Sequence, residues 1–262
     1  MSSLEGACPE GAVAATPAKL RSSTWDIVEL TVGYGLVMAV IWTPRPIQRW
    51  LYWAAIGWFL TALIMSFPGW KAMGCCIAGF WRSLWVVGVA VVMSLAAIVV
   101  AVNLHTLHRP DGPFDWLRSY GGYAVWAFLQ QLLLQGYFLL RLLRIVPNSV
   151  GAALIAAGVF SIAHLPNPIL TPITLIWGLT ACLIFIRSRN VYPLAMAHAI
   201  FGICVAITIP GPMLHNMRVG RGYLTYKAPR PVHLSQSDHT VSTVAWVIEE
   251  APARWLARHA RP

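Results

Sequence analysis

Long apolar runs separated by short polar or proline-rich connections make up most of the chain. About seven of these runs approach or reach the roughly 20 residues that an α-helix needs to cross a bilayer. The pattern predicts an all-α polytopic membrane protein, a bundle of about seven to eight transmembrane helices. The runs lie near residues 26–43, 50–67, 84–104, 121–143, 150–165, 169–187 and 191–209.

The composition supports the membrane assignment and excludes an ordinary soluble domain. Charged residues are 11% of the 262 residues, whereas soluble domains carry about 25%. The net charge of +10 would suit nucleic acid, but basic pairs between apolar runs are typical of loops held at an anionic leaflet. We therefore expect no nucleic-acid partner. The pairs are Arg45/Arg49, Lys71/Arg82, Arg141/Arg144 and Arg187/Arg189.

Three regions follow from the same pattern. Residues 1–25 are polar and are expected to form a disordered arm, and residues 26–210 hold the transmembrane bundle. Residues 211–262 form a basic tail whose end has the pattern of an amphipathic surface helix. We expect the protein in the cytoplasmic membrane of a prokaryote.

One apolar run carries three amides. In "WAFLQQLLLQGYFLLRLLR", residues 126–144, Gln130, Gln131 and Gln135 precede any charge. On an α-helix Gln131 and Gln135 share a face, and Gln130 lies about 100° around the axis from Gln131. Intramembrane glutamines often only bond a neighbouring helix, yet polar residues inside spans also mark functional sites. Because three amides lie close together here, we interpret them as part of a functional site.

Two histidines stand in later runs. His164 closes "GVFSIAHLPNP" and His198 lies in "PLAMAHAIFGI". A single histidine in a span is usually a satisfied hydrogen-bond donor. Two histidines on helices that a short hairpin can bring together indicate a shared site.

The glutamine segment resembles the first signature of the CPBP family, the CAAX prenyl endopeptidases and bacteriocin-processing (Abi-type) proteins. That signature is Glu-Glu-xxx-Arg-Gly. In "QQLLLQG", Gln130 and Gln131 stand at the glutamate positions, Gln135 stands at the arginine position, and Gly136 matches. The resemblance implies a bundle of about eight helices with an intramembrane site.

The other two family signatures follow in the same order. An aromatic residue separated from a histidine by three residues is similar to "FSIAH", with Phe160 and His164, and His-xxx-Asn is similar to "HAIFG". In the latter His198 matches and Gly202 replaces the asparagine. The resemblance covers roughly residues 120–210.

The departures from the family pattern change the expected chemistry. The resemblance implies that the first glutamate activates water and that the histidines hold this water or a metal. An amide cannot accept the proton, so Gln130 and Gln131 make proteolysis doubtful. Three neutral amides can instead hydrogen-bond in this space without the cost of burying charge. Whether His164 and His198 bind a divalent metal stays an open question, because they are two ligands and a catalytic zinc usually has three.

Three functions are compatible with these residues. The first is a CAAX-type intramembrane endopeptidase homologue, inactive or altered in mechanism. The second is a non-proteolytic enzyme that isomerises or cyclises an isoprenoid or terpenoid lipid by an initial protonation, and the third is a non-catalytic membrane binding partner. The expected partner is a membrane lipid or a prenylated substrate. The expected catalytic residues are His164, His198, Gln130 and Gln131, and the expected substrate-binding residues are Gln135, Trp126, Tyr137 and Phe160.

Overall fold

The computed structural model describes residues 23–77, 79–108, 110 and 112–227, and within them all regular structure is helical. The expected N-terminal arm up to residue 22 and the expected amphipathic end of the tail lie outside these residues. The elements are α1 (Ser23–Trp42), α2 (Ile47–Met65), α3 (Phe80–Ser83), α4 (Trp85–Asn103), α5 (Pro113–Gln131), the π-helix η1 (Leu132–Leu139), α6 (Leu140–Ile145), α7 (Ser149–Ile162), α8 (Leu170–Ser188), α9 (Tyr192–Thr208), α10 (Gly211–Leu214), the 3₁₀ turn η2 (His215–Met217) and α11 (Gly220–Leu224).

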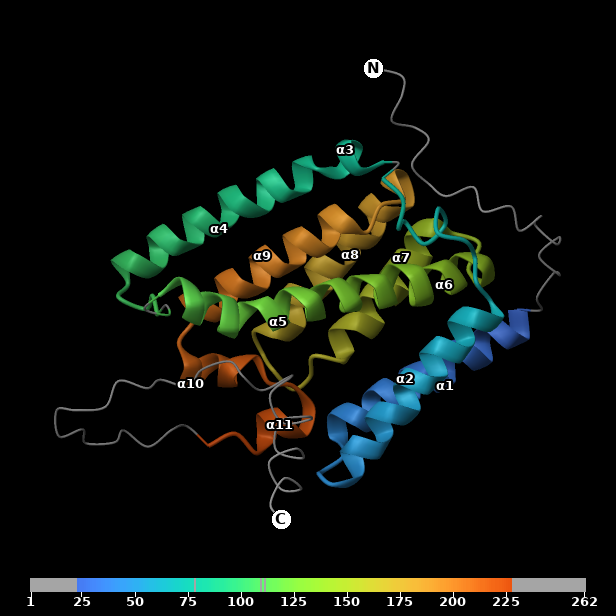
Figure 1. The fold of residues 1–262 in the computed structure, drawn as a ribbon, viewed down its shortest axis with the longest axis horizontal. Helices are drawn as coiled ribbons and strands as arrows, with labels where there is room; N and C mark the ends of the chain where they lie inside the picture. Colours follow the sequence, from blue (N-terminus) through green and yellow to red (C-terminus); the bar gives the residue numbers. More distant parts are fainter. Residues whose placement is uncertain (1–22, 78, 109, 111, 228–262) are drawn as a thin grey trace, which may run out of the picture.

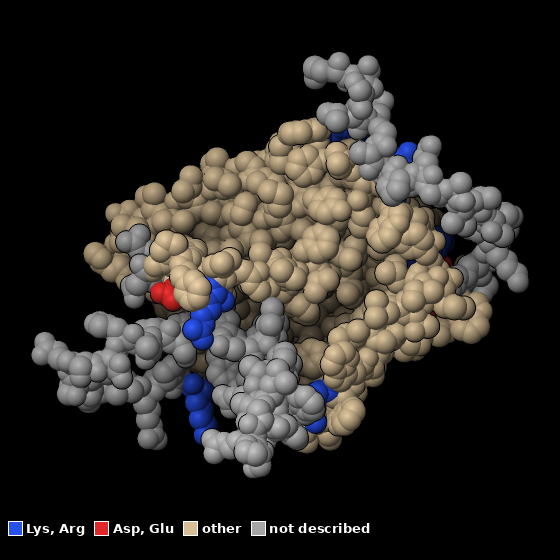
Figure 2. All heavy atoms as spheres, in the orientation of Figure 1, with Lys and Arg blue, Asp and Glu red and all other residues tan. Residues whose placement is uncertain are grey.

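Each of the seven apolar runs becomes a helix, which confirms the all-α membrane fold. Four helical stretches in the described part of the chain are long and apolar enough to cross a membrane: α1, α3 with α4, the continuous stretch from α5 to α6, and α8. Two further apolar helices, α7 and α9, are shorter. The protein is therefore an integral membrane protein. Figure 2 shows the corresponding surface, in which the broad area over α4 and α9 carries no charged side chain.

The central helix is the continuous stretch from Pro113 to Ile145, and its middle part is the π-helix η1. Six consecutive residues, 134–139, are buried there, so the helix is surrounded on all sides. On one side α5 packs against α9, which also packs against α4. Near its other end α6 packs against α1 of the α1–α2 hairpin, which lies apart from the bundle in Figure 1.

The connection between α7 and α8 is held by one asparagine in the "HLPNP" segment. Asn167 is fully buried, and its Oδ1 accepts from the backbone N–H groups of Ile169 and Leu170 at the start of α8, at 3.1 and 3.0 Å. Its Nδ2 donates to the carbonyl oxygens of Leu214 and Arg218, at 2.9 and 3.1 Å. These four bonds satisfy backbone groups that a helix end leaves unpaired. They fix the turn in which His164 lies.

Candidate functional site

A chain of hydrogen bonds links the central helix to α9. Gln135 Nε2 donates to Gln131 Oε1 at 3.3 Å, and Gln131 Nε2 contacts His198 Nδ1 at 3.1 Å. Both glutamines are fully buried and His198 is 6% exposed. The sequence placed Gln131 and Gln135 on one face of a helix, and the structure puts His198 at the end of that face.

The direction of this chain fixes the state of His198. An amide nitrogen only donates, so Nδ1 of His198 is the acceptor in its bond from Gln131. A neutral imidazole carries one proton, which then lies on Nε2. His198 therefore carries its proton on Nε2, which can donate a hydrogen bond.

His164 has the opposite arrangement. Its Nδ1 lies 2.7 Å from the carbonyl oxygen of Phe160, one turn earlier in α7. A carbonyl oxygen only accepts, so Nδ1 of His164 carries the proton and Nε2 has the free lone pair. His164 is partly exposed and is the more accessible of the two histidines. The free lone pair on its Nε2 is therefore the one that another molecule can reach.

Phe160 lies between the two histidines. Its ring centroid is 4.8 Å from that of His164 and 5.9 Å from that of His198. Trp177 of α8 also contacts His198, and their ring centroids are 6.2 Å apart. A Cβ at Gly178 would lie 3.2 Å from the Phe160 ring, so the glycine allows this close packing. The two histidines thus share an aromatic wall, as the place of Phe160 in the sequence suggested.

Two buried polar atoms of this cluster have no hydrogen-bond partner within the described part of the chain. They are Gln135 Oε1, an acceptor, and Trp177 Nε1, a donor. Buried polar atoms are usually paired, and an unpaired one indicates a role for a ligand or water. The cluster therefore offers an acceptor and a donor beyond the two histidines.

Tyr123 of α5 is a site residue that the sequence analysis missed. A Cβ at Gly202 would fall 1.7 Å from Tyr123 Oη, and 2.3 Å from the ring carbon that carries it. The tyrosine thus fills the space of a side chain at Gly202, where the family pattern has asparagine. Gly202 lies one turn after His198 on α9, so the phenol stands beside the histidine. In the sequence, the glycine at position 202 was the only feature that could have pointed to Tyr123.

Three of the expected site residues do not join this cluster. Gln130 is only partly buried and makes no hydrogen bond to another described residue, and Trp126 is 38% exposed. Tyr137 faces away toward α1 and α2: its hydroxyl donates to the carbonyl oxygen of Glu29 at 2.6 Å and accepts from Trp58 Nε1 at 3.1 Å. Only Gln131, Gln135, His164, His198 and Phe160 come together.

The prediction that Arg141 and Arg144 hold a loop at the leaflet is wrong for Arg141, which is buried, whereas Arg144 is exposed near the end of α6. Arg141 is 4% exposed and its Nε lies 2.7 Å from Glu29 Oε2, while Arg144 Nη2 lies 2.5 Å from Asp26 Oδ1. Both acids belong to α1, more than a hundred residues earlier, so no local pattern indicated the pairing. A buried charge needs a partner of opposite sign, and α1 provides two.

These ion pairs leave the histidine cluster without a carboxylate. Among the described acids, Asp26 and Glu29 are bound to the arginines, and Asp115 is exposed in the first turn of α5. No group of three histidine, cysteine or acidic side chains that would hold a metal occurs in the described residues. In this tautomer Nε2 of His198 has no lone pair free for a metal. Among the described side chains the site therefore offers fewer than the three protein ligands of a usual catalytic zinc.

The helices and this cluster define a class: an α-helical intramembrane protein with a paired-histidine site between α5, α7 and α9. Residues 112–204 match the family described as Type II CAAX prenyl endopeptidase Rce1-like, and this segment contains every member of the cluster. The CPBP resemblance is thereby confirmed over this segment, and the chain is a CAAX-protease-like membrane protein. Comparisons with curated proteins and with solved structures gave no match.

Proposed function

We propose that this protein moves a proton within a carbonyl-bearing isoprenoid lipid and does not cleave peptides by a glutamate mechanism. One observation supports this proposal most strongly: the two histidines have opposite hydrogen-bonding roles. Nδ1 of His164 donates to the carbonyl oxygen of Phe160, whereas Nδ1 of His198 accepts from Gln131. One imidazole is thereby prepared to accept a proton, and the other to donate a hydrogen bond.

The reaction that suits this pair is a double-bond shift. His164 Nε2 takes a proton from the carbon next to the conjugated system, and the electron pair moves toward the substrate carbonyl oxygen. The Nε2–H of His198 donates to that oxygen as its negative charge develops. Protonated His164 then returns the proton to a different carbon, which restores both imidazoles and leaves an isomer of the substrate.

A neutral histidine is a known type of electrophile for an enolate, in which the imidazole stabilises the oxygen by a hydrogen bond. The same neutral N–H is far too weak an acid to protonate an alkene. We therefore place base-initiated isomerisation ahead of the proton-initiated cyclisation that the aromatic residues suggested. Two features support the choice of an isoprenoid substrate: the match to a family whose name refers to prenyl groups, and Phe160 and Trp177 beside the histidines.

The resident amides support a role other than water activation. A glutamate at Gln131 would accept from His198 Nδ1–H and free Nε2 to hold water or a metal. Gln131 reverses that bond. The proposal keeps the protein in the cytoplasmic membrane of a prokaryote, where we expect its lipid substrate.

Solvent deuterium distinguishes the candidate functions. Membranes that contain the full chain are incubated in D2O with their own lipids and with an added farnesylated CAAX peptide. Mass spectrometry then follows both. We expect deuterium in an isoprenoid lipid with wild type, its loss in His164→Gln, and its retention in His108→Gln, a matched control because His108 is exposed outside the site.

Two outcomes would contradict the proposal. Cleavage of the farnesylated peptide that depends on His164 would establish a peptidase despite the amides. Identical lipid and peptide profiles in wild type and His164→Gln would leave a non-catalytic binding partner as the function of this site.

A further inference from the structure

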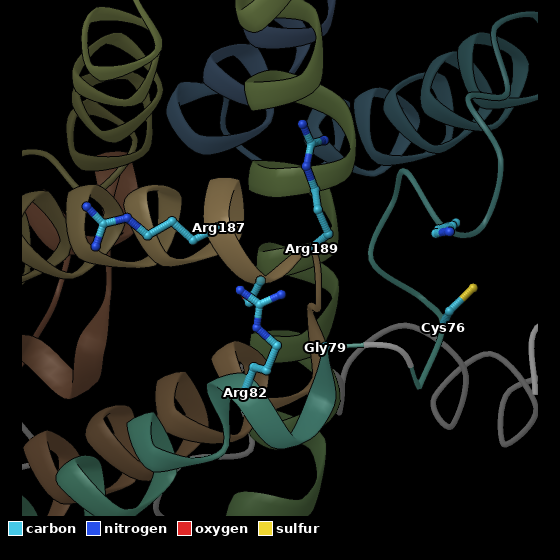
Figure 3. Close-up of a pocket in the computed structure, with 7 residues that line it drawn as sticks. Cys76, Gly79, Arg82, Arg187 and Arg189 are labelled. Atoms are coloured by element: carbon cyan, nitrogen blue, oxygen red, sulfur yellow. The ribbon is translucent and has the colours of Figure 1, made fainter. Parts of the chain in front are cut away.

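A second polar region, in addition to the histidine cluster, lies at the C-terminal end of α8. A recess of about 230 Å3 is lined there by four cations, Lys71, Arg82, Arg187 and Arg189, and Figure 3 shows the three arginines. The cations come from three segments: the α2–α3 connection, α3, and the end of α8 with the turn that follows. The 19 residues of α8 separate this end from the His164 turn by about 28 Å. The recess is therefore separate from the histidine cluster.

The recess is basic without compensation. Among the residues that the structure describes, no acidic side chain lines it, and Asp26 and Glu29 pair with Arg144 and Arg141. In Figure 3 Arg82 extends from α3 toward the gap between Arg187 and Arg189. Arginines near the end of a helix do complement its dipole, but that explains only the two residues of α8. It does not account for Lys71 and Arg82, which line the same recess from other segments.

The frame of the recess is fixed by backbone contacts. Gly79 has a φ of +79°, and a Cβ there would fall 2.1 Å from the carbonyl oxygen of Ser188, so only glycine permits this approach. Asn190, fully buried, donates to the carbonyl oxygen of Cys76 at 2.6 Å. The backbone N–H of Val191 donates to the Gly74 carbonyl at 3.0 Å. The segments that carry the four cations are thus tied together before any ligand arrives.

The surroundings of the recess are those of a bilayer interface. Three tryptophans lie within three residues of its lining residues in the sequence, and each is more than half exposed: Trp70, Trp81 and Trp85. Exposed tryptophans gather at the level of lipid headgroups. The recess also opens at the end of the spanning stretches Phe80–Asn103 and Leu170–Ser188, where headgroup phosphates lie.

We propose that this recess binds the phosphate of an anionic phospholipid headgroup. Guanidinium groups pair with phosphate oxygens in a forked geometry, and basic pockets between spanning helices suit anionic headgroups. The bound phosphate joins the α2–α3 connection to the α8–α9 turn. The site is independent of the proposed reaction at His164.

Lipid adducts of the full-length protein, measured by native mass spectrometry from detergent, test the proposal. The probes are phosphatidylglycerol, phosphatidylcholine and inorganic phosphate. The recess variant is Arg82→Gln/Arg187→Gln, and the matched control is Arg49→Gln/Arg221→Gln, which removes two exposed arginines at the other end of the molecule. We expect the recess variant to bind phosphatidylglycerol about tenfold more weakly and the control to bind it as wild type does.

Each other outcome overturns a part of the proposal. Equal losses in the recess variant and the control would mean that bulk charge, and no built site, attracts the lipid. Equal binding of phosphatidylcholine would exclude recognition of an anionic headgroup. Displacement of the lipid by an equal concentration of inorganic phosphate would assign the recess to a soluble anion. Thermal unfolding of each variant in the same detergent verifies that the folded protein is compared.

Discussion

Two faces of the central helix bury polar side chains in different ways. Toward α9, Gln131 and Gln135 form a neutral chain that ends on His198. Toward α1, Arg141 and Arg144 form ion pairs with Glu29 and Asp26. Arg141, Glu29 and Asp26 are as buried as the two glutamines, so burial alone does not decide whether charge is kept. Charged side chains are kept where ion pairs join two helices. At the positions where the family pattern has glutamates and an arginine, this chain has neutral amides.

The charged face is also the more interconnected one. The Arg141 guanidinium lies 3.8 Å from the centroid of the Tyr137 ring, and the Tyr137 hydroxyl reaches the backbone of α1. A Cβ at Gly33 would lie 2.8 Å from that hydroxyl, so glycine gives the tyrosine access to the helix backbone. These contacts attach the α1–α2 hairpin to the core, whereas the neutral chain positions one imidazole.

The largest effect is expected from breaking the charged face. Arg141→Met removes the guanidinium that lies 2.7 Å from the buried Glu29 carboxylate, and breaking a buried ion pair on one side costs about 3–5 kcal/mol of stability. Thermal unfolding of the purified protein in detergent measures this loss. The control is Glu29→Leu/Arg141→Met, which removes both charges and should be much closer to wild type. If the single and double variants unfold alike, the ion pair does not attach the hairpin.

The neutral face should give a loss of similar size or smaller, because no charge is left unpaired there. Gln131→Leu leaves His198 Nδ1 and Gln135 Nε2 without partners, at a cost of about 1–3 kcal/mol for each buried group. Gln131→Glu is more informative, because a carboxylate accepts from Nδ1–H and moves the neutral proton of His198 from Nε2 to Nδ1. Nitrogen NMR of labelled histidine reports this position directly. An unchanged His198 spectrum in Gln131→Glu would refute the assigned direction of the hydrogen-bond chain.

The sequence predicted the helices well because the signal for a spanning helix is local. All seven apolar runs became helices at nearly the expected bounds, and the order of the motifs brought Gln131, His164 and His198 into one segment. Periodicity contains no information on partners far away in the chain. Hence the pairing of Glu29 with Arg141, 112 residues apart, was not predicted. Nor were the hydrogen bonds of the Tyr137 hydroxyl to Glu29 and Trp58 in the α1–α2 hairpin.

A third prediction examines how the neutral face is packed. Gly202→Ala puts a methyl group into the Tyr123 phenol, and overpacking of this kind costs about 1–3 kcal/mol. Tyr123→Leu shortens the opposing side chain and should recover most of the loss when combined with Gly202→Ala. Thermal unfolding of the four proteins of this cycle gives the coupling between the two sites. Additive effects would mean that Tyr123 does not occupy the space that Gly202 leaves.

The smallest effect is expected at Gln130, although it stands where the family has its first glutamate. Gln130 is partly exposed and bonds to no other described residue, so Gln130→Ala should change stability by about 0.5 kcal/mol or less. Deuterium incorporation into lipid should persist in this variant and fall in Gln131→Leu. If Gln130→Ala abolishes incorporation while the fold is intact, the amide contacts the substrate and the reacting group lies on the Gln130 side of α5. The site would then be centred one helical position away from the buried chain, and His164, the partly exposed histidine, would be its nearest partner.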